Sequence, residues 1–432
     1  SGGAHDARAV VDLSGTLSLV DNTGVIATQV VPTSGVTAVG RGVALDLQAN
    51  TSGVTVRQTK ATSTSTPAIS GDILLGAGAD RIDALGGTIS GTLAFGAGAD
   101  QLNIDGAAIV SGRITDSDGQ LAVSIGEGRL NLANLDTVQL TSLNLGAKSV
   151  LSVTLDPTAT ASTRLNVAGT AAIASGAQIE LRLASLLKGP ATFEVVRAGS
   201  LQAGATAASL VGAPYLYSAQ LATDTTANTL SVNIRPKTAT ELELNRSQSQ
   251  AYNAVLSALD RNDSIEQAFL IQTGREGFLG VYDQMLPDHS GGALMSAQAI
   301  SSAISSAVGQ APSHDDGGAN GVWAQQIIFH IDRDQDQALG FKSNGFGLAA
   351  GAEMVGDTQA LGVNASFVAN EYKDQGAAAN ERVVMNFFGG GLYWRLKSGG
   401  FQAAARGGLG YVRFDSERHF TFLEANAKAD AK

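Results

Sequence analysis

The chain has 432 residues, with 28 Lys and Arg against 39 Asp and Glu, a formal net charge of −11, and no cysteine. This acidic balance argues against nucleic acid as a partner, because backbone phosphates require a basic surface. The absence of cysteine excludes disulfides and thiolate chemistry. Only 16% of the residues are charged while Gly reaches 52, which favours stacked β-strands with tight turns over a helical enzyme.

The first part of the chain contains an internal repeat of twenty residues. The segment 70–82 (SGDILLGAGADRI) realigns with the segment 90–102 (SGTLAFGAGADQL). A period near twenty is typical of one coil of a β-solenoid, in which each coil buries its apolar face against its neighbours. We therefore expect residues 1–140 to form a right-handed parallel β-helix.

Each copy of the repeat contains Gly-x-Gly-x-Asp, which places aspartates at Asp80 and Asp100. The pattern is similar to the core of calcium-binding nonapeptide repeats, in which successive turns supply ligands to Ca²⁺. Here the spacing is twenty rather than nine, so calcium is the weaker interpretation. We favour turns at a solenoid corner, with Gly at positive φ and Asp accepting hydrogen bonds from nearby backbone amides.

Residues 141–240 keep the alternation of strands but repeat less clearly. Segments such as 178–183 (QIELRL) and 229–234 (TLSVNI) alternate between apolar and polar side chains. A solenoid needs an end cap that covers its last core layer. We expect this part of the chain to be that cap.

After residue 240 the apolar period changes from 2 to 3.6, so residues 241–320 are expected to form a helical linker. Apolar side chains recur on one face from Tyr252 to Leu259, and Asp263 is expected to cap a second helix. A further helix is expected over residues 293–308, with small side chains and several serines. Two interpretations of that helix stay open: a plug in a water-filled lumen, or an ordinary packing helix.

Residues 321–432 alternate between apolar and small or polar side chains, as strands with two unlike faces do. Five runs are visible, at 321–332, 341–354, 359–372, 382–396 and 401–414. A sixth strand is expected to begin near Phe420. A membrane barrel would turn the apolar face to lipid, whereas the soluble alternative is a β-sandwich. Closed bacterial barrels have at least eight strands, so we expect an incomplete antiparallel membrane β-barrel after the β-helix and linker, and an all-β dominated chain.

Several residues of the expected barrel have roles that the alternation suggests. The aromatic residues near the strand ends are Trp323, Tyr372, Tyr393, Trp394 and Tyr411. We expect them to form the girdles at the membrane interfaces. Arg406 would be costly against lipid, so it should face the lumen and pair with an acid such as Glu353 or with the plug helix.

No convergent catalytic set is visible, so we expect no enzyme within these residues. The five histidines lack the spacing of metal-ligand pairs, and there is no Gly-x-Ser-x-Gly motif. Asp288, His289 and Ser290 are neighbours in sequence, and neighbours seldom converge into a triad, so a turn is expected. Asn320 before Gly321 offers a route to self-cleavage, but an ordinary flexible turn is the favoured interpretation.

The order of solenoid, cap, helix and barrel resembles the monomeric autotransporters of Gram-negative bacteria, the type V secretion family. Residues 217–242 resemble the junction between passenger and helical region in that family. Residues 278–288 (FLGVYDQMLPD) resemble the segment that precedes its translocator, and residues 321–324 (GVWA) resemble the opening of its first barrel strand.

This resemblance implies that the barrel is inserted in outer membrane lipid by the barrel-assembly machinery and exports a β-helical passenger to the cell surface. It also implies an export signal before residue 1 and further barrel strands after residue 432. Two alternatives remain for the working part. One is an adhesin or structural surface protein that binds a host or matrix ligand through its solenoid face; the other is an exported hydrolase with its catalytic domain upstream of residue 1.

Overall fold

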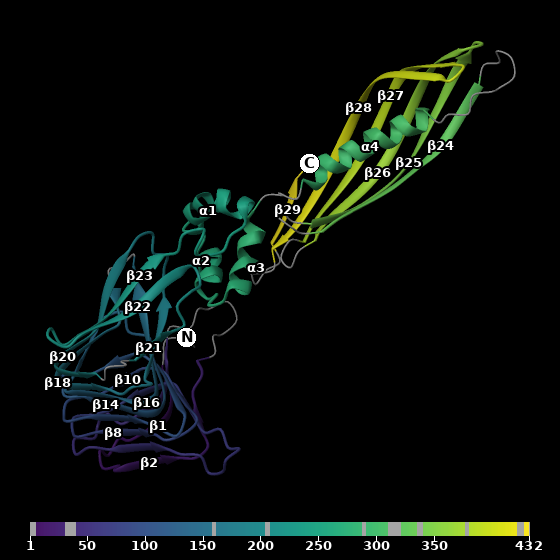
Figure 1. Cartoon of the computed structure of the whole chain (residues 1–432). Helices are drawn as coiled ribbons and strands as arrows, with labels where there is room; N and C mark the ends of the chain where they lie inside the picture. The colour runs from purple at the N-terminus through teal and green to yellow at the C-terminus, as the bar shows by residue number, and fades with distance from the viewer. Residues whose placement is uncertain are drawn as a thin grey trace. The chain divides into compact units, whose positions relative to one another are not determined.

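Figure 1 shows the computed structural model of the chain, which is mostly β. It describes residues 6–30, 40–157, 161–203, 208–286, 291–309, 321–334, 340–375, 380–420 and 427–431, with the backbone alone at 161, 380, 381, 417–420 and 427–431. The contacts divide the chain into two compact units, Ser1–Lys237 with Leu270–Gly274, and Thr238–Phe269 with Arg275–Lys432. Within the described ranges, no helix is long and apolar enough to cross a membrane.

The regular elements described in the first unit are strands. They are β1 (Ala7–Val11), β2 (Leu19–Asn22), β3 (Val25–Ala27), β4 (Gly42–Asp46), β5 (Thr55–Gln58), β6 (Ala68–Ser70), β7 (Asp72–Leu74), β8 (Arg81–Ala84), β9 (Thr88–Ser90), β10 (Leu93–Ala94), β11 (Gln101–Ile104), β12 (Ala108–Gly112), β13 (Ile114–Thr115), β14 (Ala122–Leu132), β15 (Thr137–Leu140), β16 (Ser142–Asp156), β17 (Ala161–Ser162), β18 (Arg164–Ile173), β19 (Gln178–Leu183), β20 (Ala191–Ala203), β21 (Ser209–Val211), β22 (Tyr217–Asp224) and β23 (Thr229–Pro236).

These strands stack in parallel with an offset of about twenty residues. Arg81 in β8 pairs with Gln101 in β11, which pairs with Ala122 in β14. The strands β7, β10 and β13 form a second parallel row, and β6, β9 and β12 form a third. Apolar side chains of the three rows are buried, among them Ile69, Ile73, Ile82, Ile89, Leu93 and Leu102. The repeat seen in the sequence is therefore the pairing register of successive coils.

Backbones approach so closely at one corner of the stack that only glycine fits. A Cβ atom added at Gly96 would overlap the carbonyl oxygen of Gly76, and one added at Gly76 would overlap the carbonyl oxygen of Asn50. Backbone atoms of neighbouring coils cannot move apart without breaking the parallel ladder that holds them. The glycines of the repeat thus set the spacing of the coils.

We expect Gly96→Ala to destabilise the first unit by about 2–4 kcal/mol, because the added methyl group forces two coils apart. Thermal unfolding followed by circular dichroism of the purified chain should show a midpoint lowered by about 5–10 °C. Gly24→Ala is the control, since nothing lies within 4 Å of its added Cβ. Equal midpoints for the two variants would contradict the close approach.

The direction of pairing changes at the end of the stack. The strands β16, β18, β19 and β21 continue the parallel stacking, whereas β23 pairs antiparallel with both β20 and β22. Within the region expected to be the cap, the strands of this antiparallel sheet thus lie at residues 191–203 and 217–236. Leu230, Val232 and Ile234 of β23 are buried. The antiparallel sheet therefore adds an apolar layer to the last coils.

The second unit begins with helices α1 (Arg246–Leu259), α2 (Asp263–Leu270) and α3 (Arg275–Met285). The predicted cap of α2 at Asp263 is wrong by one residue. The Asn262 Oδ1 atom accepts hydrogen bonds from the backbone N–H groups of Ser264 at 3.0 Å and Ile265 at 3.1 Å, and Asp263 is already helical. The rings of Phe269, Phe278 and Tyr282 pack together between these helices.

An antiparallel sheet in chain order and one helix complete the second unit. The helix is α4 (Gly292–Gly309), and the strands are β24 (Gly321–Arg333), β25 (Gly340–Val355), β26 (Gln359–Gln375), β27 (Asn380–Ser398), β28 (Phe401–Phe420) and β29 (Ala427–Ala431). Figure 1 shows α4 lying along one face of this sheet. The sixth strand begins at Ala427 rather than near Phe420, because β27 extends back to Asn380 and gives β28 a pairing partner as far as His419.

Candidate functional site

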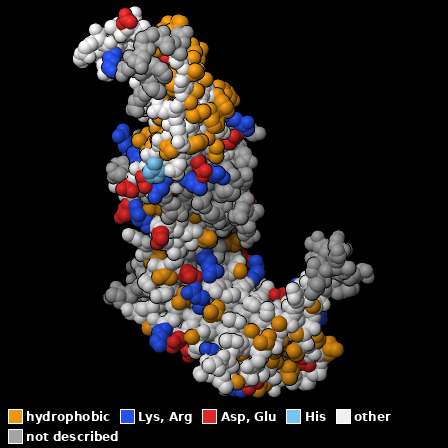
Figure 2. All heavy atoms as spheres, turned by 90° about the vertical axis from the view of Figure 1, so that its right-hand side faces the viewer, with side chains coloured by type: hydrophobic (Ala, Val, Ile, Leu, Met, Phe, Trp, Pro, Cys, Tyr) orange, Lys and Arg blue, Asp and Glu red, His pale blue; other side chains and the backbone are white. Residues whose placement is uncertain are grey.

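The sheet β24–β28 has two chemically different faces, which we call the inner face, against α4, and the outer face. On β25, Phe346 and Leu348 point outward and are 58% and 51% exposed, whereas Glu353 points inward and is 4% exposed. The outer face is apolar along its middle, and Figure 2 shows hydrophobic side chains gathered over this part of the molecule. Such a face suits lipid, while the inner face suits an aqueous lumen.

The predicted aromatic girdles are wrong for three of the five residues. Trp323, Tyr372 and Tyr393 lie on the inner face and are buried, because strand parity sends them to the side opposite the apolar row. Tyr411 does lie on the outer face and is 67% exposed. The outer face has another aromatic contact, between Phe367 and Phe388, whose ring centroids are 4.9 Å apart.

The inward aromatic rings lie directly over glycines of neighbouring strands. The Trp323 ring covers Gly351, and the Tyr393 ring covers Gly362, so a side chain at either glycine would collide with a ring. Each ring fills the space that the missing side chain leaves. This arrangement fixes the rings against the wall and leaves room for a helix inside.

A buried polar cluster ties three strands together at one end of the inner face. Trp323 Nε1 donates a hydrogen bond to Tyr393 Oη at 2.7 Å, and Tyr393 Oη donates to Glu353 Oε2 at 2.9 Å. The Arg395 guanidinium forms an ion pair with the same Glu353 oxygen. The sequence prediction missed Arg395, although its odd-numbered position on β27 places it on the inner face with Tyr393.

The helix α4 packs on the inner face through an apolar stripe. Ile300, Ile304, Ala307 and Val308 are buried in one cluster with the wall residues Trp323, Ile327, Ala349, Val368, Tyr372, Val383, Met385 and Tyr393. Nearer its N-terminus, Ser296 shares a hydrogen bond with Ser343 at 2.9 Å, and Ser343 donates to Asn370 at 2.8 Å. The helix therefore packs closely on one face of the sheet.

Arg406 and Glu353, which were expected to pair, are not brought together. Arg406 Nη1 donates a hydrogen bond to Ser305 Oγ of α4 at 2.9 Å. Glu353 is instead bonded to Arg395 and Tyr393. The structure therefore has the second of the two predicted partners for Arg406, the helix.

A belt of charged side chains borders the apolar part of the outer face. Lys342 lies 3.3 Å from Asp332, and Glu371 lies 3.1 Å from Lys373 and 3.0 Å from Arg382. These groups occupy the ends of the strands near the connections 334–339 and 376–379. Charged side chains there mark the level at which the apolar surface ends.

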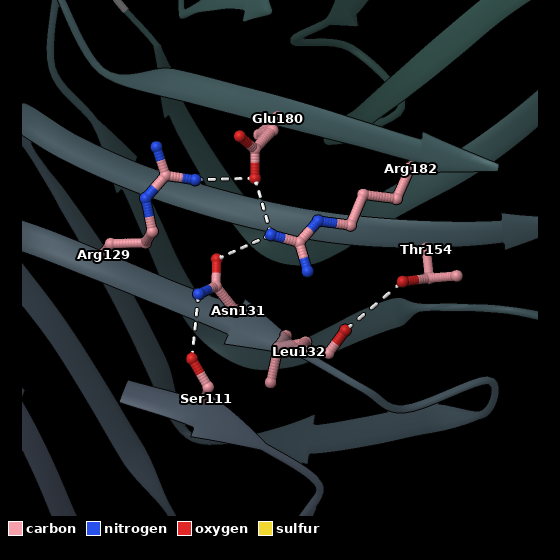
Figure 3. A network of polar contacts seen from close by, with 7 residues as sticks. All are labelled: Ser111, Arg129, Asn131, Leu132, Thr154, Glu180 and Arg182. Carbon is pink, nitrogen blue, oxygen red and sulfur yellow. Dashed lines mark hydrogen bonds and ion pairs between the residues drawn. The ribbon is translucent and has the colours of Figure 1, made fainter. Parts of the chain in front are cut away.

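The first unit contains a polar network outside this site. Figure 3 shows Asn131 donating to Ser111 at 2.9 Å, and Glu180 accepting from Arg129 at 2.6 Å and from Arg182 at 3.2 Å. These bonds link side chains on the solvent side of neighbouring coils. They stabilise the stack and leave no catalytic group free of partners in this network.

The calcium candidates Asp80 and Asp100 cap backbone amides. Asp80 Oδ1 accepts a hydrogen bond from Val54 N at 2.8 Å, and Asp100 Oδ1 accepts one from Asp80 N at 2.8 Å. No group of three or more acidic or histidine side chains that could hold a metal ion occurs among the residues the structure describes. Asp288, His289 and Ser290, and Asn320, lie outside those residues.

The antiparallel sheet and its lipid-compatible outer face fit a membrane β-barrel domain. Residues 322–432 match the family model described as Autotransporter beta-domain. This match supports a type V autotransporter with a C-terminal translocator domain, which secretes a passenger across the outer membrane. No curated protein and no solved structure matches the chain.

Proposed function

We propose that residues 1–237 are the passenger, that they form a right-handed parallel β-helix, and that the C-terminal barrel displays them on the cell surface. The single observation that supports this most is α4, which packs along the inner face and directly precedes β24 in the chain. A helix in that position is what remains in the lumen after the preceding chain has passed through. The right hand follows from the usual sense of parallel crossover connections.

The connections between strands support an orientation in the membrane. The strands β25 and β26, and β27 and β28, are joined by the short segments 356–358 and 399–400, which are typical of the periplasmic side. Ser305 of α4 bonds Arg406 near that end, whereas Ser296 bonds Ser343 near the opposite end. The N-terminal end of α4 therefore faces the outside, where a passenger would emerge.

Folding of the passenger would make export directional. Each coil buries apolar side chains against the coil before it, so a coil that closes outside the cell opposes return of the chain. The partners in this scheme are outer membrane lipid on the outer face and the barrel-assembly machinery during insertion. A catalytic role is not part of the proposal.

An adhesive role is the second candidate. The solvent side of the coils presents charged and amide side chains in register, as in the network of Figure 3. A repeated polar surface suits a host or matrix ligand. Binding of whole cells to immobilised matrix proteins, lost when residues 1–237 are deleted, would support this candidate. The alternative, an exported hydrolase with its catalytic domain upstream of residue 1, would instead be detected by hydrolysis of a substrate.

Site-directed labelling tests the proposed topology. Because the chain lacks cysteine, Ser90→Cys introduces a single thiol at an exposed position of β9. We expect a membrane-impermeant maleimide to label this variant on intact cells, and gel migration of the C-terminal part to change on heating. Ser296→Cys, buried between α4 and the wall, is the matched control that should stay unlabelled. Labelling of Ser90→Cys only after lysis would contradict surface display.

A further inference from the structure

Three aspartates of successive coils gather at the glycine-rich corner of the stack. Asp80 and Asp100 are each only 1% exposed, and one oxygen of each accepts a backbone hydrogen bond from the neighbouring coil or strand. Asp116, in the following coil, accepts from Leu121 N at 3.1 Å through Oδ2. One oxygen of each of the three carboxyl groups thus accepts a hydrogen bond from a backbone N–H group.

The second oxygen of each group is buried without a hydrogen-bond donor in the described part of the chain. These atoms are Asp80 Oδ2, Asp100 Oδ2 and Asp116 Oδ1. A buried carboxylate oxygen with no donor is costly, and the cost falls when the group binds a proton. The corner is therefore least stable when all three groups are ionised.

The charges around Asp100 add to this cost. The groups that act on it are acids, Asp80, Asp116 and the exposed Asp118. Arg81 is next to Asp80 in sequence, but its guanidinium bonds Asp83 at 2.7 Å. Arg113, in the next coil, pairs with Asp136. Arg81 and Arg113 thus form ion pairs with carboxylates other than Asp100.

We propose that this aspartate stack takes up a proton from solvent when the coils close, so that the corner is held more tightly in mild acid than at neutral pH. The proton resides on an oxygen that lacks a donor and removes the repulsion between stacked carboxylates. The inference is independent of export through the barrel, because it concerns only contacts within the first unit.

The direction of the pH dependence follows from the protonation of Asp100. Burial, with the neighbouring acids, raises the pKa of Asp100 to about 6 from an ordinary value of 3.8, and burial also raises the pKa values of Asp80 and Asp116. A carboxyl whose folded pKa is raised contributes full stability below the unfolded pKa. That contribution is lost as the pH rises from about 4 through about 6.

Amide hydrogen exchange of the full chain in detergent micelles tests the proposal. We expect the protection factors of peptides containing Val54 and Asp80, corrected for intrinsic rates, to fall by about 10- to 100-fold between pH 4.5 and pH 7.5. Asp100→Asn keeps an oxygen acceptor for Asp80 N and cannot ionise, so its protection should change less than about threefold over the same range.

Two controls separate protonation of the stack from titration of the surface and from binding of a cation. Asp118→Asn alters an exposed carboxyl at the same corner, whose pKa is lowered by the Gly98 amide. It should keep most of the wild-type pH dependence, because burial and the other acids act more strongly on Asp100 than Asp118 does. The second control adds 5 mM CaCl₂ at pH 7.5, which exceeds the dissociation constants of about 10⁻⁴–10⁻³ M that are typical of calcium sites in extracellular modules. Protection that is flat with pH, or equally steep in Asp100→Asn, overturns the proposal. Restored protection with calcium would also overturn it, since a cation would then occupy the corner in place of a proton.

Discussion

Replacing Ile304 by aspartate is expected to drive α4 out of the lumen. Ile304 is 0% exposed in the apolar cluster between helix and wall, and none of the residues of that cluster is a cation that could pair with a carboxylate there. Burial of an unpaired charge costs several kcal/mol, which exceeds the contribution of the two hydrogen bonds at Ser296 and Ser305. The helix should therefore leave the wall while the barrel remains.

Permeability of the outer membrane measures this effect. Cells that express Ile304→Asp should become sensitive to large hydrophilic antibiotics such as vancomycin, and the purified protein should show a several-fold larger conductance in planar bilayers. Ser306→Asp is the matched control, because it puts the same charge on the exposed side of the same helix. Equal permeability of both variants would show that α4 does not close the lumen.

Removal of Glu353 is expected to be the most damaging change in the wall. Glu353→Leu leaves the largely buried Arg395 without its carboxylate and Tyr393 without its acceptor. Breaking a buried ion pair in this way costs about 3–5 kcal/mol. We expect the heat-modifiable, folded fraction of the barrel to fall sharply at moderate urea concentrations.

A double variant distinguishes lost pairing from lost packing. Glu353→Leu with Arg395→Met removes both charges and should recover most of the folded fraction, because apolar replacements of a buried pair are often close to neutral. Glu371→Leu removes a partly exposed carboxylate on the outer face and should cost only about 0–1 kcal/mol. If the double variant is as unstable as Glu353→Leu, the ion pair is not the origin of the effect.

The local sequence pattern predicted where the strands and helices lie better than it predicted which side chains contact one another. The period of two located the strands β24–β28, and the twenty-residue repeat matched the pairing register of the coils. The helix α3 was not predicted, because its sequence REGFLGVYDQM has two glycines and a weak apolar stripe. The cap at Asn262 was missed because Asn262 and Asp263 are both good capping residues, and only geometry distinguishes them.

The polar cluster of the wall could not be read from the sequence alone. Parity assigns Glu353, Tyr393 and Arg395 to the inner face, but their meeting depends on the register across β25, β26 and β27. The girdle prediction failed because residue type was given more weight than parity: Trp323 follows the outward Val322 and must point inward. Strand parity, applied to every aromatic residue, would have corrected it.

The twenty-residue register has a mechanical consequence. Adjacent strands lie about 4.8 Å apart, so each added coil lengthens the stack by only that distance. Twenty residues of extended chain span about 66–72 Å. Closing one coil thus takes up an extended length of chain more than ten times the height that it adds to the stack. A small growth of the folded stack is therefore accompanied by a large shortening of the unfolded chain. Burial of apolar side chains in the interior of the stack favours this shortening of the extended chain.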